Sequence, residues 1–69
     1  MMYEIHLSNQ QLVLPISNPW VALSAVLCRL RLDKRTDMTS RRSLLDQLTR
    51  KGSVSLTNDA ETIEIVRCD

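Results

Sequence analysis

Few residues of this chain have the type and spacing that enzymatic chemistry requires. His6 is the single histidine, and Glu4 is the one carboxylate near it in the sequence. A general base is usually oriented by a carboxylate, but residues two apart on a strand share one face, so we expect only a surface ion pair here. The serines lack a nucleophile-elbow motif. We therefore predict no catalytic residues and no enzyme activity.

Metal and cofactor sites are not predicted either. A zinc site would have to combine Cys28, Cys68 and His6, whose spacing resembles no zinc motif. The single glycine, Gly52, cannot form a glycine-rich phosphate loop. Two cysteines do not make a disulfide scaffold, so we interpret Cys28 as a core residue and Cys68 as a loosely held residue near the C-terminus.

Length and composition indicate one small globular domain over residues 1–69. Hydrophobic residues make up 43% of the chain and charged residues 25%, which is typical of a folded rather than a disordered protein. A domain of this size buries only about 60% of its unfolded surface, so its stability is marginal. The only aromatic residues are Tyr3 and Trp20, and the core must therefore be aliphatic.

The sequence also contains no pattern for membrane insertion or secretion. The longest apolar stretch, residues 20–32, is interrupted by Ser24, Arg29 and Arg31 and is shorter than the roughly 20 residues of a membrane span. Residues 1–4 lack the basic region of a signal peptide. We therefore expect a cytoplasmic protein with no membrane partner.

The pattern of apolar residues predicts an α+β fold in the order ββααββ, with two helices packed on β-hairpins. Residues 3–16 should form an N-terminal hairpin with a turn at 8–10, and Pro15 should place its second strand at a sheet edge. Residues 53–67 alternate in the same way around a polar turn and predict a C-terminal hairpin. The predicted core consists of Trp20, Leu23, Leu27, Leu30, Leu44, Leu45, Leu48, Val54, Leu56, Ile63 and Ile65.

The first predicted helix covers residues 19–32, with Asn18 as its N-cap and Pro19 at its first position. A helical wheel gives it two apolar faces, of which one is the core stripe. The second has the four-three-four spacing of a helix-packing seam: Val21, Ala25, Cys28 and Leu32. So small a chain cannot easily surround such a helix, so we expect a homodimer or a partner at the seam, with burial beneath the hairpins as the alternative.

The second predicted helix covers residues 39–51. Thr39 or Ser40 is its expected N-cap, and Gly52 should end it. Arg41 and Arg42 lie near its start, where positive charge opposes the helix dipole at a cost of roughly 0.3–1 kcal/mol per residue.

Charge is unevenly distributed along the chain. Eight of the nine basic residues and three of the eight acidic residues lie between positions 29 and 51, a net charge of +5, whereas the remaining residues have one basic and five acidic side chains, a net charge of −4. We interpret part of this segment as a surface for an anionic partner, with a solvated, salt-bridged face as the alternative: Arg41, Arg42, Gln47, Arg50 and Lys51.

Two functions from different classes fit these features. A small non-enzymatic protein-binding regulator is favoured, namely an inhibitor, adaptor or anti-activator of the phage or mobile-element accessory type that occupies the surface of a cytoplasmic protein. Alternatively, residues 40–54 resemble the recognition helix and wing of winged helix-turn-helix domains, which implies DNA binding by the helix at 39–51. A wing that lies along phosphates should be basic, whereas the hairpin tip at 58–61 is acidic.

Overall fold

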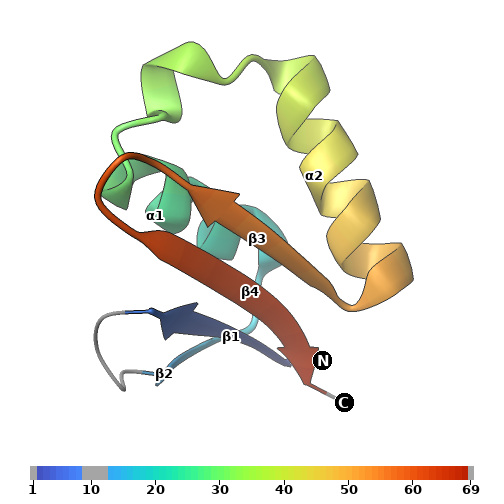
Figure 1. Ribbon diagram of the computed structural model, residues 1–69. Coiled ribbons are helices and arrows are strands. Elements are labelled where there is room, and N and C mark those ends of the chain that lie inside the picture. The colour runs from blue at the N-terminus through green and yellow to red at the C-terminus, as the bar shows by residue number, and fades with distance from the viewer. Residues whose placement is uncertain (1, 9–12, 69) are drawn as a thin grey trace.

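The protein has the expected small α+β fold in the order ββααββ. The structure, a computed structural model, describes residues 2–8 and 13–68 (Figure 1). Its elements are β1 (Met2–Leu7), β2 (Val13–Ile16), α1 (Pro19–Arg29), the short 3-10 helix η1 (Asp33–Arg35), α2 (Met38–Lys51), β3 (Ser53–Thr57) and β4 (Thr62–Cys68). Residues 9–12, which include most of the predicted turn at 8–10, lie outside the described residues.

The two hairpins join into one antiparallel sheet with the strand order β2-β1-β4-β3 (Figure 1). The junction is the pairing of β1 with β4, in which Ile5 lies opposite Ile65 and Leu7 lies opposite Ile63. β2 is an edge strand, as Pro15 predicts, because proline has no N–H to give to a further strand. The first and last strands of the chain thus form the centre of the sheet.

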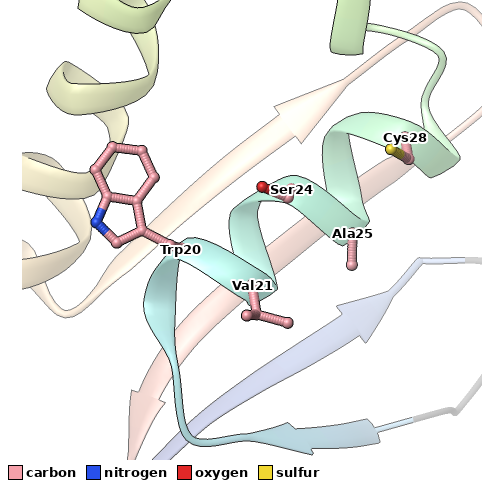
Figure 2. Close-up of a pocket in the computed structure, with 5 residues that line it drawn as sticks. All are labelled: Trp20, Val21, Ser24, Ala25 and Cys28. Atoms are coloured by element: carbon pink, nitrogen blue, oxygen red, sulfur yellow. The ribbon is translucent and has the colours of Figure 1, made fainter.

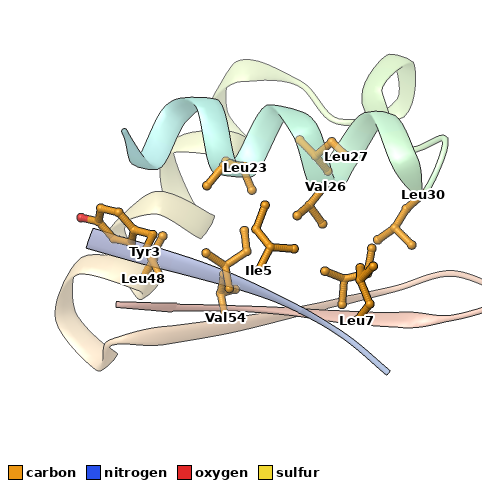
Figure 3. Packing of buried hydrophobic residues seen from close by; sticks show 12 residues of the cluster. Tyr3, Ile5, Leu7, Leu23, Val26, Leu27, Leu30, Leu48 and Val54 are labelled. Atoms are coloured by element: carbon orange, nitrogen blue, oxygen red, sulfur yellow. The ribbon is translucent and has the colours of Figure 1, made fainter. Parts of the chain in front are cut away.

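Both helices pack on one face of this sheet and enclose a core that is aliphatic except for Tyr3 (Figure 3). Alternate residues of β1 face the helices, because successive side chains of a strand point to opposite sides. The buried residues are Tyr3, Ile5, Leu7, Ala22, Leu23, Val26, Leu27, Leu30, Leu48, Val54, Ile63 and Ile65.

Most of the predicted core residues are buried, but four are not. Leu44, Leu45 and Leu56 are only partly buried and pack against the edge of the core. Trp20 is 42% exposed, so its prediction as a core residue was wrong. The sheet-facing position in this turn of α1 belongs to Ala22, which is fully buried, whereas Trp20 lies on the flank that faces α2 (Figure 2).

The sequence predicted that the first helix would extend to residue 32, but α1 ends at Arg29. Arg31 adopts a left-handed conformation with φ = 60°, which is rare for a residue with a side chain and breaks the helical path. The N–H of Leu32 then donates to the carbonyl of Leu27 at 2.9 Å, and the Leu32 side chain packs against the core. Leu32 therefore does not continue the seam along α1.

α2 begins at Met38, and its N-cap is Asp37 rather than Thr39 or Ser40. The Asp37 carboxylate accepts a hydrogen bond from the Ser40 N–H at 2.8 Å. This backbone hydrogen bond lowers the pKa of Asp37, because it stabilises the charged carboxylate. The predicted caps Asn18 and Gly52 are both present.

Replacing Asp37 with alanine is expected to lower the midpoint of thermal unfolding, because the Ser40 N–H loses its acceptor. Asp37 has a lowered pKa when folded, so it stabilises the protein above its unfolded pKa, and this contribution is lost as the pH falls through the folded pKa. Asp37→Asn keeps an acceptor that does not titrate. The midpoint of wild type relative to Asp37→Asn should therefore fall between neutral and acidic pH. A constant difference would contradict the role of the Asp37 carboxylate as the N-cap of α2.

Replacing Gly52 with alanine is expected to cost about 1 kcal/mol of unfolding free energy. Gly52 ends α2 in the left-handed region at φ = 82°, where its N–H donates to the carbonyl of Leu48. A Cβ atom at this position would have room, since its nearest neighbour is Arg67 Nη2 at 3.9 Å, so the cost comes from the backbone conformation. Urea unfolding measures it. Gly52→Asn should cost less, because asparagine tolerates this region better, and a larger cost would contradict the explanation.

Candidate partner-binding surface

The side of α1 that faces away from the sheet presents a nearly apolar surface. We call it the α1 strip, and its residues line a shallow hollow (Figure 2): Trp20, Val21, Ser24, Ala25 and Cys28. Val21 is 53% exposed and Trp20 42%. A helix normally presents polar side chains to solvent on this side, but Ser24 is the only polar member of the strip.

The helical repeat explains why these residues lie together. Val26 faces the sheet, and Cys28, two positions later, is turned by about 200° and so faces solvent. Cys28 is exposed, and its interpretation as a core cysteine was therefore wrong. Val21 and Ala25 lie on the same side as Cys28, so three of the four predicted seam residues meet in the strip, and only Leu32 lies elsewhere.

A second hollow adjoins the C-terminal end of the strip and shares Cys28 with it. Three exposed basic residues line this hollow, Arg31, Lys34 and Arg35, and none of them forms an ion pair within the described part of the chain. Asp33 also lines it, but its carboxylate is paired with Arg41 at 2.8 Å. These three residues were not predicted as a site from the sequence, although they lie close together in a short charged segment.

A third hollow adjoins the other end of the strip, where Trp20 lies between α1 and α2. Arg42 lines it and, among the residues described, has no ion-pair partner. Asp46 lines it too, but pairs with Arg50 at 3.1 Å, four residues further along α2. We use the name basic rim for the unpaired cations at both ends of the strip: Arg31, Lys34, Arg35 and Arg42.

Arg41, which the sequence predicted as a partner-binding residue, is half-buried, and its guanidinium is bonded within the protein. Its side chain is 19% exposed, and its Nη2 donates to both the carbonyl and the carboxylate of Asp33, at 2.7 and 2.8 Å. Its Nε donates to the carbonyl of Thr36 at 3.0 Å. Arg41 therefore connects η1 to the first turn of α2, and these bonds offset its unfavourable position in the helix dipole.

The other predicted partner-binding residues are exposed on α2 but do not form one cluster. Arg42 and Gln47 are five residues apart, which places them about 140° apart around the helix. Arg42 lies beside the α1 strip, whereas Arg50 is paired with Asp46, and Lys51 lies at the end of the helix. Of this set, only Arg42 is brought to the strip.

The acidic tip of the β3–β4 hairpin is attached to the end of α1. Asn58 Nδ2 donates to the carbonyl of Leu30 at 3.1 Å, and Arg29 Nε donates to Glu61 Oε1 at 3.2 Å. The side chain of Glu61 is largely buried in this contact. The hairpin tip thus holds the C-terminal end of the strip in place and does not project freely into solvent.

The open face of the sheet has the predicted surface pair of Glu4 and His6, whose Oε1 and Nε2 atoms are 3.1 Å apart. Hydrogen bonds from Cys68 and, to a lesser extent, from His6 lower the pKa of Glu4. Over residues 2–8 and 13–68, no three His, Cys, Asp or Glu side chains converge as metal ligands do. None of the helices described has the length and apolar character to cross a bilayer.

Comparisons with protein-family models, curated proteins and solved structures give no match for this chain. The features of the molecule that bear on function are the α1 strip, the basic rim and the attached hairpin tip. This arrangement provides an exposed apolar surface with positive charge at both ends.

Proposed function

We propose that this protein is a non-enzymatic regulator that binds another protein through the α1 strip. The single observation behind the proposal is the exposure of Val21 and Trp20 on a helix whose opposite side already fills the core. Contiguous apolar surface of this kind on a small domain is typical of an interaction site. The regulator acts by occupying the partner's surface, as an inhibitor or adaptor does.

The dimensions of the strip suit a segment of a partner protein. α1 has 11 residues and is therefore about 16 Å long. The hollows at both ends lengthen this surface, because they share Cys28 and Trp20 with it. In the proposal the partner is a cytoplasmic protein. The homodimer that the sequence predicted would use this same surface and is a competing occupant of it.

Binding of DNA by α2 also stays a prediction. Exposed Arg42, Arg50 and Lys51 support it, whereas the attachment of the acidic hairpin tip to α1 favours a protein partner. Affinity for nonspecific duplex DNA, measured over a range of salt concentrations, tests the alternative. A DNA-binding protein loses affinity steeply as salt rises, because its basic residues displace counterions from the phosphates.

Replacing Val21 with aspartate is expected to reduce partner binding at least about tenfold, because a charge would be buried in an apolar contact. The immobilised protein is incubated with nuclease-treated cytoplasmic extract, and the captured protein is quantified for wild type and for Val21→Asp. Ser43→Asp is the matched control, since it adds the same charge to an exposed position of α2 outside the strip.

The proposal requires that capture survive nuclease treatment, fall in Val21→Asp and persist in Ser43→Asp. Equal capture by wild type and Val21→Asp would exclude the α1 strip as the binding surface. Capture that disappears after nuclease treatment would show that nucleic acid mediates the contact. Circular dichroism of both variants verifies that they are folded, which is expected because both positions are exposed.

A further inference from the structure

We infer that the partner segment bound by the α1 strip is an acidic amphipathic helix, with an apolar stripe that packs on the strip and carboxylates that contact the basic rim. This inference rests on the proposed function and identifies the chemistry of the partner. Three observations support it: the positive charge around the strip is largely unpaired, the strip residues have the size and spacing of a helix-packing surface, and a second copy on the same surface would bring like charges together.

The charge around the strip is positive and largely uncompensated. Arg31, Lys34 and Arg35 lie at its C-terminal end and Arg42 at its other end, without ion pairs in the described chain. The two carboxylates that line these end hollows do not offset this charge, because each is already paired with another arginine, Arg41 or Arg50. Glu61 of the hairpin tip is likewise paired, with Arg29. A partner with Asp or Glu beside its apolar stripe would therefore complement both ends of the surface.

The residues of the strip favour a helix as the bound segment. Val21, Ala25 and Cys28 follow the four-three spacing at which ridges of one helix fit between those of another. Ser24 and Ala25 are small and allow the backbone of a partner helix to approach closely. Trp20 points toward α2 and lines one side of the hollow (Figure 2). An extended peptide gains affinity chiefly by pairing with the edge of a sheet, and α1 offers no such edge.

A second copy of this chain is disfavoured on the same surface. If two copies packed with α1 helices antiparallel, the residues Arg31, Lys34 and Arg35 of one copy would approach Arg42 of the other. If the helices were parallel, each end of the basic rim would approach the same basic residues of the other copy. Both arrangements place like charges together, which opposes association. An acidic helix removes this repulsion.

A peptide-display selection tests the inference with a defined probe. The library consists of helical peptides with a fixed Leu/Ala stripe, randomised flanking positions and no tryptophan, and it is selected on the immobilised full-length chain. We expect Asp and Glu to be enriched at the flanks. The selected peptides are then titrated in solution, with the fluorescence of Trp20, the single tryptophan, as the readout of contact with the strip.

Reversing the charge of three basic-rim residues should reverse the preference for acidic over basic peptides. For the Arg31→Glu/Lys34→Glu/Arg35→Glu variant, we expect about a tenfold or greater loss of affinity for the acidic peptide and a gain for a peptide with lysine at the same flanks. Lys51→Glu is the matched control, because Lys51 is an exposed cation of α2 that lines none of the three hollows. Its affinity for the acidic peptide should change less than about twofold.

The outcomes separate this inference from the proposed function. Acidic peptides that bind Val21→Asp as well as wild type would contradict both. Peptides that need Val21 but show no acidic enrichment would overturn only the inference. Self-association of the protein alone that is abolished by Val21→Asp would also overturn the acidic helix. So would a shift of Trp20 fluorescence caused by anionic phospholipid vesicles or duplex DNA, if the shift is lost in the charge-reversed rim variant and no peptide is enriched.

Discussion

Replacing Leu48 with alanine is expected to leave a large fraction of the molecules unfolded at room temperature. Leu48 is 1% exposed and is the one fully buried residue of α2. Truncation of such a leucine removes its transfer free energy and leaves a cavity, at a combined cost of about 2–5 kcal/mol. A single core of this size supplies only about 3–5 kcal/mol in total. The loss at this one position is therefore comparable with the stability of the whole domain.

The measurement is urea unfolding followed by far-UV circular dichroism, with Leu44→Ala as the matched control. Leu44 is also on α2 and undergoes the same chemical change, but it is only partly buried against the core. Its cost should be clearly smaller, because the truncated side chain leaves a surface depression rather than a closed cavity. Equal costs for the two variants would show that Leu48 is not the main attachment of α2 to the sheet.

Replacing Arg41 with methionine is expected to cost about 1–2 kcal/mol, which is the second-largest effect. The change removes three hydrogen bonds from a charged donor, two to Asp33 and one to the Thr36 carbonyl. Lysine should not restore the stability, because one ammonium group cannot reproduce the planar guanidinium that reaches both residues. Urea unfolding of Arg41→Met and Arg41→Lys tests this expectation.

Arg42→Met is the control for this prediction. Arg42 is the next residue along α2, is exposed and forms no ion pair among the described residues, so its loss should change stability by less than about 0.5 kcal/mol. Partner binding should be weakened more by Arg42→Met than by Arg41→Met, because Arg42 belongs to the basic rim. Equal stability losses in the two variants would contradict the structural role of Arg41.

The parts of the fold that depend on local rules could be predicted from the sequence. Alternation in β1 and in the C-terminal hairpin identifies strands, because side chains of a strand alternate between two faces. Asn18 and Gly52 mark helix ends, because each satisfies backbone groups within a few residues of itself. Val21, Ala25 and Cys28 were found as a second apolar face of α1 for the same reason, since only the helical repeat is involved.

The remainder depends on contacts that no local rule specifies. The left-handed conformation of Arg31 ends α1 early and carries Leu32 away from the seam, although nothing in the residue type indicates it. Arg41 resembles an ordinary exposed cation until η1 places Asp33, eight residues earlier, beside it. The exposure of Trp20 follows from where the sheet lies beneath α1, which the helical wheel cannot show.

The central position of β4 has a consequence for how the chain folds. β4 is the last described strand in the sequence, yet it pairs with both β1 and β3. During synthesis, β1 can meet only β2, and an isolated two-stranded hairpin is marginal in water. Pairing of Met2 with Cys68 closes a loop of nearly the entire chain, an entropic cost that must be met before the contact contributes. We therefore expect folding to begin only after β4 has left the ribosome, and to be slower than in helical domains of this length.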